Sequence, residues 1–593
     1  MKLSKLYSND NRFREVIFNK NFNIVLGEIR YVDYLNRDSH NLGKSTLVDL
    51  IDFMLLKSID KSHFLKKIKG FEDHIFYLEI ELNSGKYITI KRSVKLNTKI
   101  SMKFHEERHM DFRNCIEWDY ENIPLKSSDK NKNPKDILQK ALNFDVLGDE
   151  SYRKTLGYFF RTQNDYRDVF KLQKHQGADT DWKPALFELL GFSSGFMIEK
   201  YKLDEKIKRK KDLAHKIQEE LKTDSGEVDK INGLIEIKQE ERDKILSWLD
   251  HFNFYQKESN ISKEVLEDIE NEVAKYNTQR YNLDFEIQQI KESLKEKVEY
   301  NLEDVLEIYK EVEIYFAEDL KKSYEQLLEF NKKVAVERQK YLLQTLEEKE
   351  KRRNWIDDEL KVLNDKRVNM LEGLKNTNTF DKYNKYRSDL IDVERELERY
   401  KSELESIDNV KNIDREIYSL SEELSSMKNK LSEQVIEGTE VYKEIRRDFH
   451  EYVKYILNKD AMLSIRINTN GNADFNAEIL NDKNEETAQN SGHTYKKILC
   501  ACFDLAVVKN YVNRSFYRTI YHDGCLESLD PRKRKKYLNL IRKITQEYNI
   551  QYILTCLKSD IPEGEEYQIK DEEIAVTLYD EQDNSGRLFG FEF

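Results

Sequence analysis

Proline is nearly absent from this sequence, and its placement constrains the fold. Only 5 of the 593 residues are proline, and none lies between positions 185 and 530. Glycine is also scarce, with 19 residues. Because both residues interrupt helices, their scarcity leaves the middle of the chain free to form long helices.

Cysteine is equally rare, with five residues, and no two of them form a Cys-x-x-Cys pair. An odd, scattered set argues against a disulfide framework and against a structural zinc site, and it favours a reducing compartment. The cysteines are Cys115, Cys500, Cys502, Cys525 and Cys556.

Long apolar runs are missing as well. A helix that crosses a membrane needs about 18 or more consecutive apolar residues, and no such run occurs. The first residues, Met1-Lys2-Leu3-Ser4-Lys5, lack the apolar core of a signal peptide. We therefore expect a cytoplasmic protein with no membrane partner.

Charged residues are abundant. They make up 36% of the chain, against 39% hydrophobic residues. This balance is too polar for one compact globule of this length, but it suits long solvated helices. The formal net charge is −12, so any contact with nucleic acid must come from a local basic patch.

The most informative stretch runs from Asp38 to Thr46, with the sequence Asp-Ser-His-Asn-Leu-Gly-Lys-Ser-Thr. An apolar run precedes it, and a segment with helical apolar spacing follows, which is the context of a P-loop. In such a loop Lys44 would reach the β- and γ-phosphates of ATP, and the Ser45 hydroxyl would bind Mg²⁺. The residues predicted to hold the nucleotide here are Asn41, Leu42, Gly43, Lys44, Ser45 and Thr46.

The motif departs from the P-loop pattern at its start. The pattern asks for glycine five residues before Gly43, where Asp38 stands. The nearest upstream glycine is Gly27, so residues 28–37 would form an insertion within the loop. The alternative is a chance Gly-Lys-Ser turn at a helix start, in a sequence rich in lysine and serine.

Residues 196–438 show heptad spacing, which is the signature of a coiled coil. One run is Ile269, Val273, Tyr276, Arg280, Leu283, Ile287, Ile290 and Leu294, and others begin at Tyr383 and Ile413. Candidate breaks fall at 224–226, 248–255, 300–301 and 376–379. We expect an antiparallel hairpin with joints or a folded-back tip. A set of ordinary bundle helices is the alternative.

The flanking regions, 1–195 and 439–593, read as mixed α/β. In the first, 74–82 and 87–93 predict a hairpin, and 23–26 a strand. In the second, strands are expected at 461–467, 474–479, 519–523 and 551–556, and helices at 495–509 and from Pro531 to about Tyr548. A last strand is expected at 586–593.

A zinc-protease pattern, His-Glu-x-x-His, occurs at 105–109. That chemistry needs both histidines on one helical face. The flanking residues favour strand and turn, so a charged turn is the preferred interpretation.

A P-loop half, a long helical hairpin and a second α/β half together resemble the SMC/RecN-type ABC ATPases. The resemblance is strongest to the SMC-like ATPases of bacterial ABC-three-component and Lamassu-type defence operons, where Asn-Leu-Gly-Lys-Ser-Thr follows an extended loop. Phe330 to Leu342 is also similar to that group. The resemblance implies an α/β P-loop NTPase head of the ABC type, split by a long antiparallel coiled coil at 196–438.

The resemblance also assigns roles to single residues. Gln163 stands at the Q-loop position, where it would sense Mg²⁺ and the attacking water. Ser491 and Gly492 stand in for the signature loop, which would grip the γ-phosphate of ATP on a second subunit. His493 and Thr494 depart from the Gly-Gln usual there.

In the C-terminal half, Asp523 fits the Walker B aspartate and Asp530 the D-loop. The glutamate that normally follows the Walker B aspartate is replaced by Gly524, and Glu527 is the nearest acid that could act as base. Thr555 to Lys558 occupy the place of the switch histidine. These departures argue against fast hydrolysis but leave ATP-driven head pairing intact.

The resemblance further implies a homodimer formed through the heads, contact with double-stranded DNA, and a partner effector nuclease with a small accessory subunit. Two basic runs, Lys206 to Lys211 and Arg532 to Lys536, could contact DNA phosphates. In a chain this charged, a solvated helix face is the simpler reading of both. A second hypothesis is a coiled-coil scaffold whose hydrolysis-deficient head serves as a docking platform.

Overall fold

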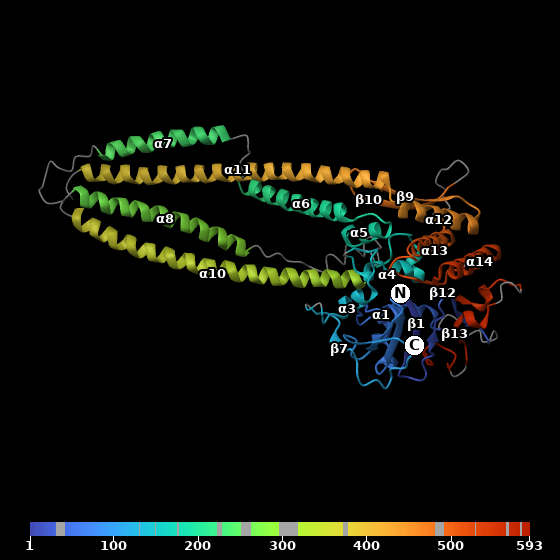
Figure 1. The fold of residues 1–593 in the computed structure, drawn as a ribbon. Helices are drawn as coiled ribbons and strands as arrows, with labels where there is room; N and C mark the ends of the chain where they lie inside the picture. The colour runs from blue at the N-terminus through green and yellow to red at the C-terminus, as the bar shows by residue number, and fades with distance from the viewer. Residues whose placement is uncertain are drawn as a thin grey trace. The chain divides into compact units, whose positions relative to one another are not determined.

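The computed structural model divides into two compact units. One is formed by residues 1–203 with 423–593, and the other by residues 204–422. The structure describes residues 1–30, 42–127, 129, 131–148, 150–174, 177–221, 228–250, 263–295, 318–371, 378–480, 492–527, 529–564, 569–581 and 584–592. Figure 1 shows the elements with the labels used below.

A five-stranded parallel sheet forms the centre of the first unit, with the order β13-β3-β12-β11-β8. Every pairing in it is parallel. Strands from the two ends of the sequence interleave in this sheet, so neither half can complete it alone. The strands are β3 (Phe22–Glu28), β8 (Phe160–Arg161), β11 (Thr519–Asp523), β12 (Gln551–Leu557) and β13 (Ile574–Tyr579).

The central strands are apolar runs buried along nearly their whole length. Continuous apolar strands are typical of parallel sheets, whose two faces are both covered. The predicted strands at 23–26, 519–523 and 551–556 are therefore confirmed.

A second, antiparallel sheet has the order β2-β1-β4-β5-β6-β7. The hairpin predicted at 74–82 and 87–93 is confirmed, because β4 and β5 pair with Glu81 opposite Tyr87. The strands are β1 (Lys2–Ser8), β2 (Val16–Ile17), β4 (Ile75–Glu81), β5 (Tyr87–Ser93), β6 (Lys99–His105) and β7 (Tyr120–Pro124).

Helix α1 (Lys44–Met54) contacts strands of both sheets. Six of its eleven residues are buried apolar side chains, which explains why this short helix is fixed in place. The other helices of this unit are α2 (Phe64–Lys67), α3 (Pro134–Leu142), α4 (Tyr152–Phe159), α5 (Asp179–Leu189), α12 (Glu440–Leu457), α13 (His493–Asn510) and α14 (Pro531–Tyr548).

The C-terminal half contains one correct and one wrong strand prediction. A two-stranded sheet of β9 (Ala461–Ile467) and β10 (Ala473–Ile479) matches the expected hairpin. The strand expected at 586–593 is wrong, because its described residues form turns and bends. The strand that joins the parallel sheet is β13, which the sequence analysis missed.

The His-Glu-x-x-His pattern forms a strand end and a turn, which confirms the charged-turn interpretation. His105 ends β6, and His109 has a left-handed φ of 64°. The buried carboxylate of Glu79 accepts the backbone N–H groups of His109 and Met110 at 2.8 and 3.1 Å. Within the described ranges, no group of three or more His, Cys, Asp or Glu side chains could hold a metal ion.

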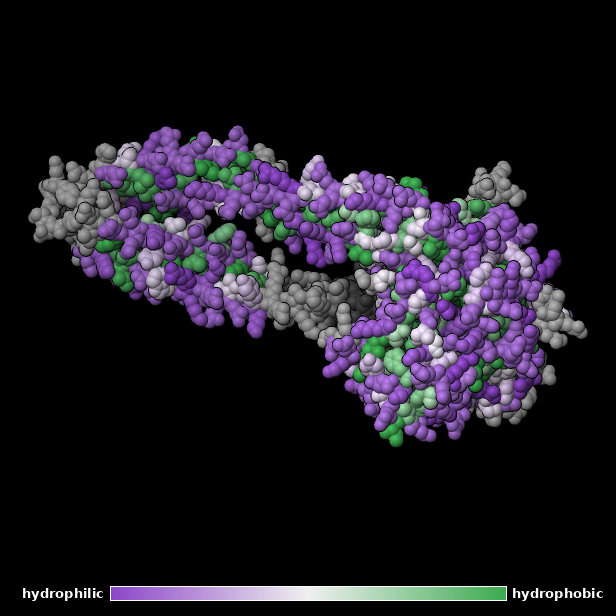
Figure 2. Space-filling model, viewed as in Figure 1, coloured by the Kyte–Doolittle hydropathy of each residue, from purple (hydrophilic) through white to green (hydrophobic). Residues whose placement is uncertain are grey.

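Long helices make up the second unit. They are α7 (Val228–Asp250), α8 (Lys263–Lys295), α10 (Glu318–Leu371), and most of α6 (Gly195–Leu221) and α11 (Asn378–Glu437). The breaks expected at 224–226 and 300–301 lie outside the described residues, as do residues 251–255 of the third break and 376–377 of the fourth. Figure 2 shows hydrophilic residues over most of the visible surface of these helices.

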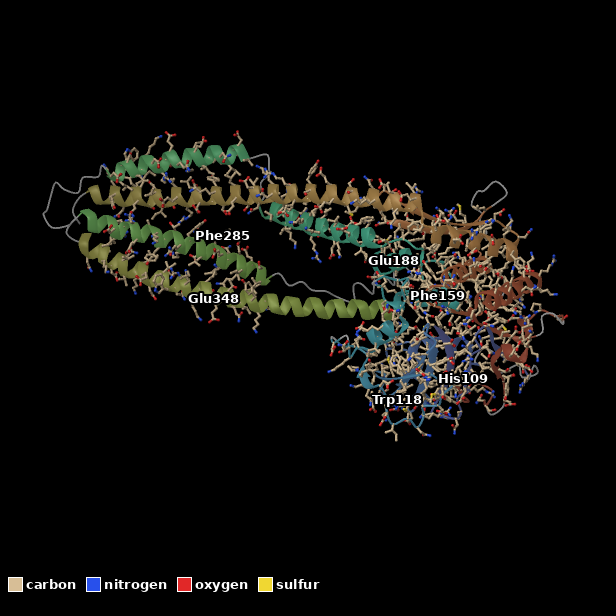
Figure 3. All side chains as sticks on the ribbon, viewed as in Figure 1. His109, Trp118, Phe159, Glu188, Phe285 and Glu348 are labelled. Atoms are coloured by element: carbon tan, nitrogen blue, oxygen red, sulfur yellow. The ribbon has the colours of Figure 1, made fainter. Side chains whose placement is uncertain are left out.

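Helices α8 and α10 pair antiparallel through heptad positions. Ile269 and Val273 on α8 share an apolar cluster with Ile356, Leu360 and Leu363 on α10. Ion pairs Arg280–Asp357 at 3.4 Å and Lys291–Glu350 at 2.7 Å fix the direction, because one residue number rises as the other falls. Figure 3 labels Phe285 on α8 and Glu348 on α10.

Helix α8 also lies along α11, but in the parallel direction. Arg387 donates to the carbonyl of Glu270 at 2.8 Å. The guanidinium of Arg395 lies 5.1 Å from the ring centre of Tyr281. Between these two contacts the residue numbers rise on both α8 and α11, so the two helices run in the same direction. The α8–α10 pair is therefore folded back against α11. This agrees with the expectation of an antiparallel hairpin with a folded-back tip.

Candidate nucleotide-binding site

The predicted phosphate loop ends in a glycine whose conformation suits the role. Gly43 has φ of 97° and precedes the first residue of α1. A left-handed residue at this point costs nothing for glycine but is strained for other residues. The first N–H groups of α1 have no partner within the helix and are available to an anion. Asn41 lies outside the described residues.

Lys44 folds back over the end of β3. A Cβ atom on Gly27 would lie 3.1 Å from Lys44 Cδ and 3.2 Å from its Nζ, so Gly27 leaves the space that this side chain needs. Burial lowers the pKa of Lys44, and the nearby carboxylates of Glu527 and Asp523 oppose that shift. The lysine therefore faces the acids of the C-terminal half.

Asp523 ends β11 and is buried. Its Oδ1 accepts a hydrogen bond from Thr555, and the Ser45 hydroxyl is near enough to lower the pKa of the same carboxylate. Burial raises the pKa of Asp523, while these two hydroxyls and the charges of Lys44 and Lys497 oppose the rise. The side chains from residues 44, 45 and 523 thus meet at one point.

The second oxygen of Asp523 is the feature that fits a metal. Oδ2 is buried and has no hydrogen-bond partner among the described residues. An orphaned buried carboxylate oxygen is costly unless something binds it. Mg²⁺ binds through one or two protein oxygens, with water and phosphate oxygens completing its shell, so the pair of Ser45 and Asp523 fits that ion.

Gly524 is the meeting point of three side chains. Its φ is 64°, and a Cβ atom there would lie 3.0 Å from Gln163 Nε2 and 3.0 Å from Glu527 Oε2. Lys497 of α13 donates to the Gly524 carbonyl at 2.8 Å and lies 3.7 Å from Glu527. The structure therefore places Gln163 and Glu527 together, beside Asp523.

Thr555 is the first of the residues, 555–558, that stand where the resemblance implies a histidine. Its hydroxyl donates to Asp523 and accepts the N–H of Gly524 at 2.9 Å. It supports the turn after β11 from the neighbouring strand.

The remaining predicted residues are less involved. Asp530 caps α14, accepts the N–H groups of Arg532 and Lys533 at 3.1 Å, and pairs with the Lys533 ammonium at 3.0 Å. Gly492 precedes α13 in an extended conformation. Ser491 lies outside the described residues. Leu42 is buried, and Thr46 lies in the first turn of α1.

Sequence reasoning missed a buried polar network behind the site. Arg161 of β8 donates to both oxygens of Asp504 on α13, at 2.6 and 2.8 Å. His522, next to Asp523, lies 2.9 Å from the same carboxylate. Burial lowers the pKa of His522. In the sequence, the only sign of this network is that Arg161 and Asp504 are each a single charged residue next to or within an apolar run.

Arg161 also holds the segment that carries Gln163. It donates to the carbonyls of Asp165 at 2.9 Å and Val169 at 2.8 Å. The network therefore links β8, α13 and β11, each of which supplies a residue of the candidate site.

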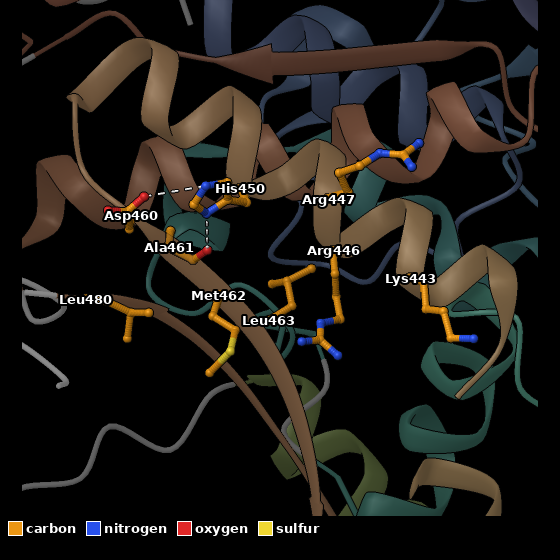
Figure 4. Close-up of a pocket in the computed structure, with 9 residues that line it drawn as sticks. All are labelled: Lys443, Arg446, Arg447, His450, Asp460, Ala461, Met462, Leu463 and Leu480. Carbon is orange, nitrogen blue, oxygen red and sulfur yellow. Dashed lines mark hydrogen bonds and ion pairs between the residues drawn. The ribbon is translucent and has the colours of Figure 1, made fainter. Parts of the chain in front are cut away.

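A basic groove lies on another part of this unit, between α12 and β9. Figure 4 shows His450 bonded to Asp460 and to the carbonyl of Ala461, beside three cationic side chains. The residues that line the groove are Lys443, Arg446, Arg447, His450, Asp460, Ala461, Met462, Leu463 and Leu480.

Comparison with known proteins finds similarity along the whole chain. A family model described as "Uncharacterised protein conserved in bacteria (DUF2326)" matches residues 452–593. The chain is 21% identical to "Uncharacterized protein YydD" of Bacillus subtilis (strain 168), over 96% of this chain and 95% of that protein.

Similar solved structures include the Smc head domain with a coiled coil and joint from Pyrococcus yayanosii. The match has 15% identity and a TM-score of 0.34, and it covers 93% of this chain and 92% of that one. The recombination mediator RecF with ATP matches at 11% identity and a TM-score of 0.28, over 95% and 94%. At these scores the likenesses carry no argument about what this chain binds.

Among the described residues, no helix is both long enough and apolar enough to cross a membrane.

Proposed function

We propose that this protein is an SMC-like ATPase that binds ATP with Mg²⁺ at the junction of its two sequence ends. The observation that carries the proposal is the unpartnered, buried Oδ2 of Asp523 beside Ser45 and Lys44. These groups come from opposite ends of the chain, and they supply the cation, hydroxyl and carboxylate that Mg·ATP recognition requires.

Each residue has a role in the proposed reaction. The N–H groups at the start of α1 and the ammonium of Lys44 bind the phosphates. Ser45 and Asp523 hold Mg²⁺, which neutralises phosphate charge when bound. Gln163 orients the attacking water, and Glu527 accepts its proton.

Hydrolysis is expected to be slow. The acid that would serve as base, Glu527, is four positions from Asp523, and its carboxylate lies 3.7 Å from the ammonium of Lys497. Residues 555–558 contain no histidine, and Thr555 offers a hydroxyl to Asp523. ATP binding would drive pairing of two heads through Ser491 and Gly492, and hydrolysis would release them.

DNA binding and effector control are further parts of the proposal. Cations on α12 and α14, including Arg446 and Lys536, offer phosphate contacts whose strength falls with salt. Lys210 of the other basic run is paired with Glu416, which reduces its availability. By resemblance, double-stranded DNA, a nuclease effector and a small accessory subunit are the proposed partners in a bacterial anti-phage or anti-plasmid defence complex.

Lys44→Ala tests the proposal through ATP-dependent dimerisation, followed by analytical ultracentrifugation with and without Mg·ATP. The wild type should shift from monomer to dimer, and Lys44→Ala should remain monomeric. Lys67→Ala, a change at an exposed lysine on α2, serves as the matched control. ATP-dependent dimers in Lys44→Ala would refute the proposal.

A second candidate is a scaffold whose head binds ATP without hydrolysing it. Gly524 favours it, because no acid follows Asp523 directly. Steady-state turnover decides between the two. A slow turnover that falls about 100-fold in Glu527→Gln supports the ATPase, whereas Glu563→Gln, at an exposed position, should have no effect. No turnover in the wild type, with or without DNA, supports the scaffold.

A further inference from the structure

Residues 584–592 pack directly against the end of the phosphate loop. The N–H of Leu588 donates to the carbonyl of Leu42 at 3.1 Å, and the carbonyl of Leu588 accepts the N–H of Arg14 at 2.9 Å. Leu588 is fully buried. Both backbone groups of this residue are therefore committed, one of them to the loop.

The side chain of Leu588 closes the space beside Gly43. A Cβ atom on Gly43 would lie 2.7 Å from Leu588 Cβ, which is closer than real contacts allow. Position 43 thus requires glycine for two reasons: its φ is left-handed, and Leu588 leaves no space for a side chain.

The segment is itself firmly anchored. Phe589 is fully buried, and its ring centre lies 4.7 Å from that of Phe71 and 5.6 Å from that of Phe13. The N–H of Tyr579 donates to the carbonyl of Gly586 at 2.9 Å. The anchor can therefore hold Leu588 in position against the loop.

The hydrogen bond to Leu42 has a consequence for phosphate binding. In a trans peptide, the C=O of one residue and the N–H of the next point in opposite directions. Fixing the Leu42 carbonyl on Leu588 therefore aims the Gly43 N–H away from Leu588. That N–H is one of the donors that a phosphate loop offers to its ligand.

We infer that Leu588 is a positioning residue for the phosphate loop, and that segment 584–592 acts as a clamp that sets the orientation of the Leu42–Gly43 peptide. The inference rests on the proposed function, because it names what holds the nucleotide-binding loop.

Leu588→Pro tests the clamp, because proline lacks the N–H that Leu42 accepts. Phe449→Ala is the control, since it removes a fully buried side chain from α12, a helix that packs on α13, α14 and β9. ATP affinity and Tm are measured for both variants. We expect Leu588→Pro to weaken ATP binding about tenfold, and Phe449→Ala to lower Tm while ATP affinity changes less than about twofold.

Hydrogen exchange in the absence of nucleotide gives a second readout. Leu588→Pro should speed exchange at the start of α1, and Phe449→Ala should not. Wild-type ATP affinity in Leu588→Pro, or losses in both variants that simply follow Tm, would overturn the clamp. A wild type that binds no ATP would instead refute the proposed function, and the exchange experiment would still test the clamp.

Discussion

The carboxylate of Glu527 occupies the space that a side chain on Gly524 would need. A Cβ atom at position 524 would lie 3.0 Å from both Cδ and Oε2 of Glu527. An acid at 524 would therefore press on Glu527, whose carboxylate would have to move by a few tenths of an ångström. In the proposed site, the acid would come from three residues further along than position 524.

Gly524→Glu should consequently not restore fast hydrolysis. The left-handed φ of 64° alone should cost about 1–2 kcal/mol of stability, and the new side chain would displace Gln163 and Glu527. We expect a lower Tm and a lower turnover number. Gly233→Ala on α7, where nothing lies within 4 Å of the new Cβ, should leave both unchanged or raise Tm. Faster turnover in Gly524→Glu would contradict this account.

Thr555→Val should weaken the support of Asp523. The valine keeps the shape of threonine but leaves Asp523 Oδ1 and the Gly524 N–H without their partner. We expect a loss of about 1–3 kcal/mol in the free energy of unfolding, together with weaker Mg²⁺-dependent ATP binding. Thr555→Ser keeps the hydroxyl and should retain Mg²⁺ dependence. Equal Mg²⁺ dependence in Val and Ser variants would argue against the role.

Asp504→Leu should be strongly destabilising, because it leaves the fully buried guanidinium of Arg161 without its counter-charge. Breaking a buried pair in this way costs about 3–5 kcal/mol. The double variant Arg161→Met/Asp504→Leu should recover part of that stability, measured by urea denaturation. If the double variant is no more stable than Asp504→Leu, the pair is not the source of the effect.

His63 should make the protein less stable in mild acid. Burial lowers its pKa to about 4, and its ring packs 4.8 Å from that of Phe64. The unfolded state therefore binds the proton more tightly, so the stability due to neutral His63 is complete above about pH 6.5 and is lost as the pH falls towards 4. His63→Leu should reduce the fall in Tm between pH 7 and 5. His215→Gln, at an exposed histidine, should leave that fall unchanged.

Local chemistry allowed several elements to be predicted from sequence. Helix α14 begins at Pro531, directly after the capping Asp530, and proline at the first helical position is a strong start signal. The strand β11 is short and ends in an acid. The heptad run from Ile269 to Leu294 indicated the helix that the structure shows as α8.

Other features depend on tertiary contacts that no local pattern encodes. The strand expected at 586–593 is rich in apolar residues, but Phe589 and Phe591 pack against Phe71 and have no strand partner in the described part of the chain. The partnership of Arg161 with Asp504 joins positions more than 340 residues apart. The position of Glu527 depends on the left-handed turn at Gly524. That turn cannot be predicted from a single sequence.

The most direct test of the account is the Mg²⁺ dependence of ATP binding, measured by calorimetry in the wild type, Lys44→Ala and Asp523→Asn. The account predicts that Mg²⁺ strengthens binding to the wild type, that Lys44→Ala loses binding with or without the ion, and that Asp523→Asn loses the strengthening. Wild-type Mg²⁺ dependence in Asp523→Asn would show that the two ends of the chain do not share one nucleotide site.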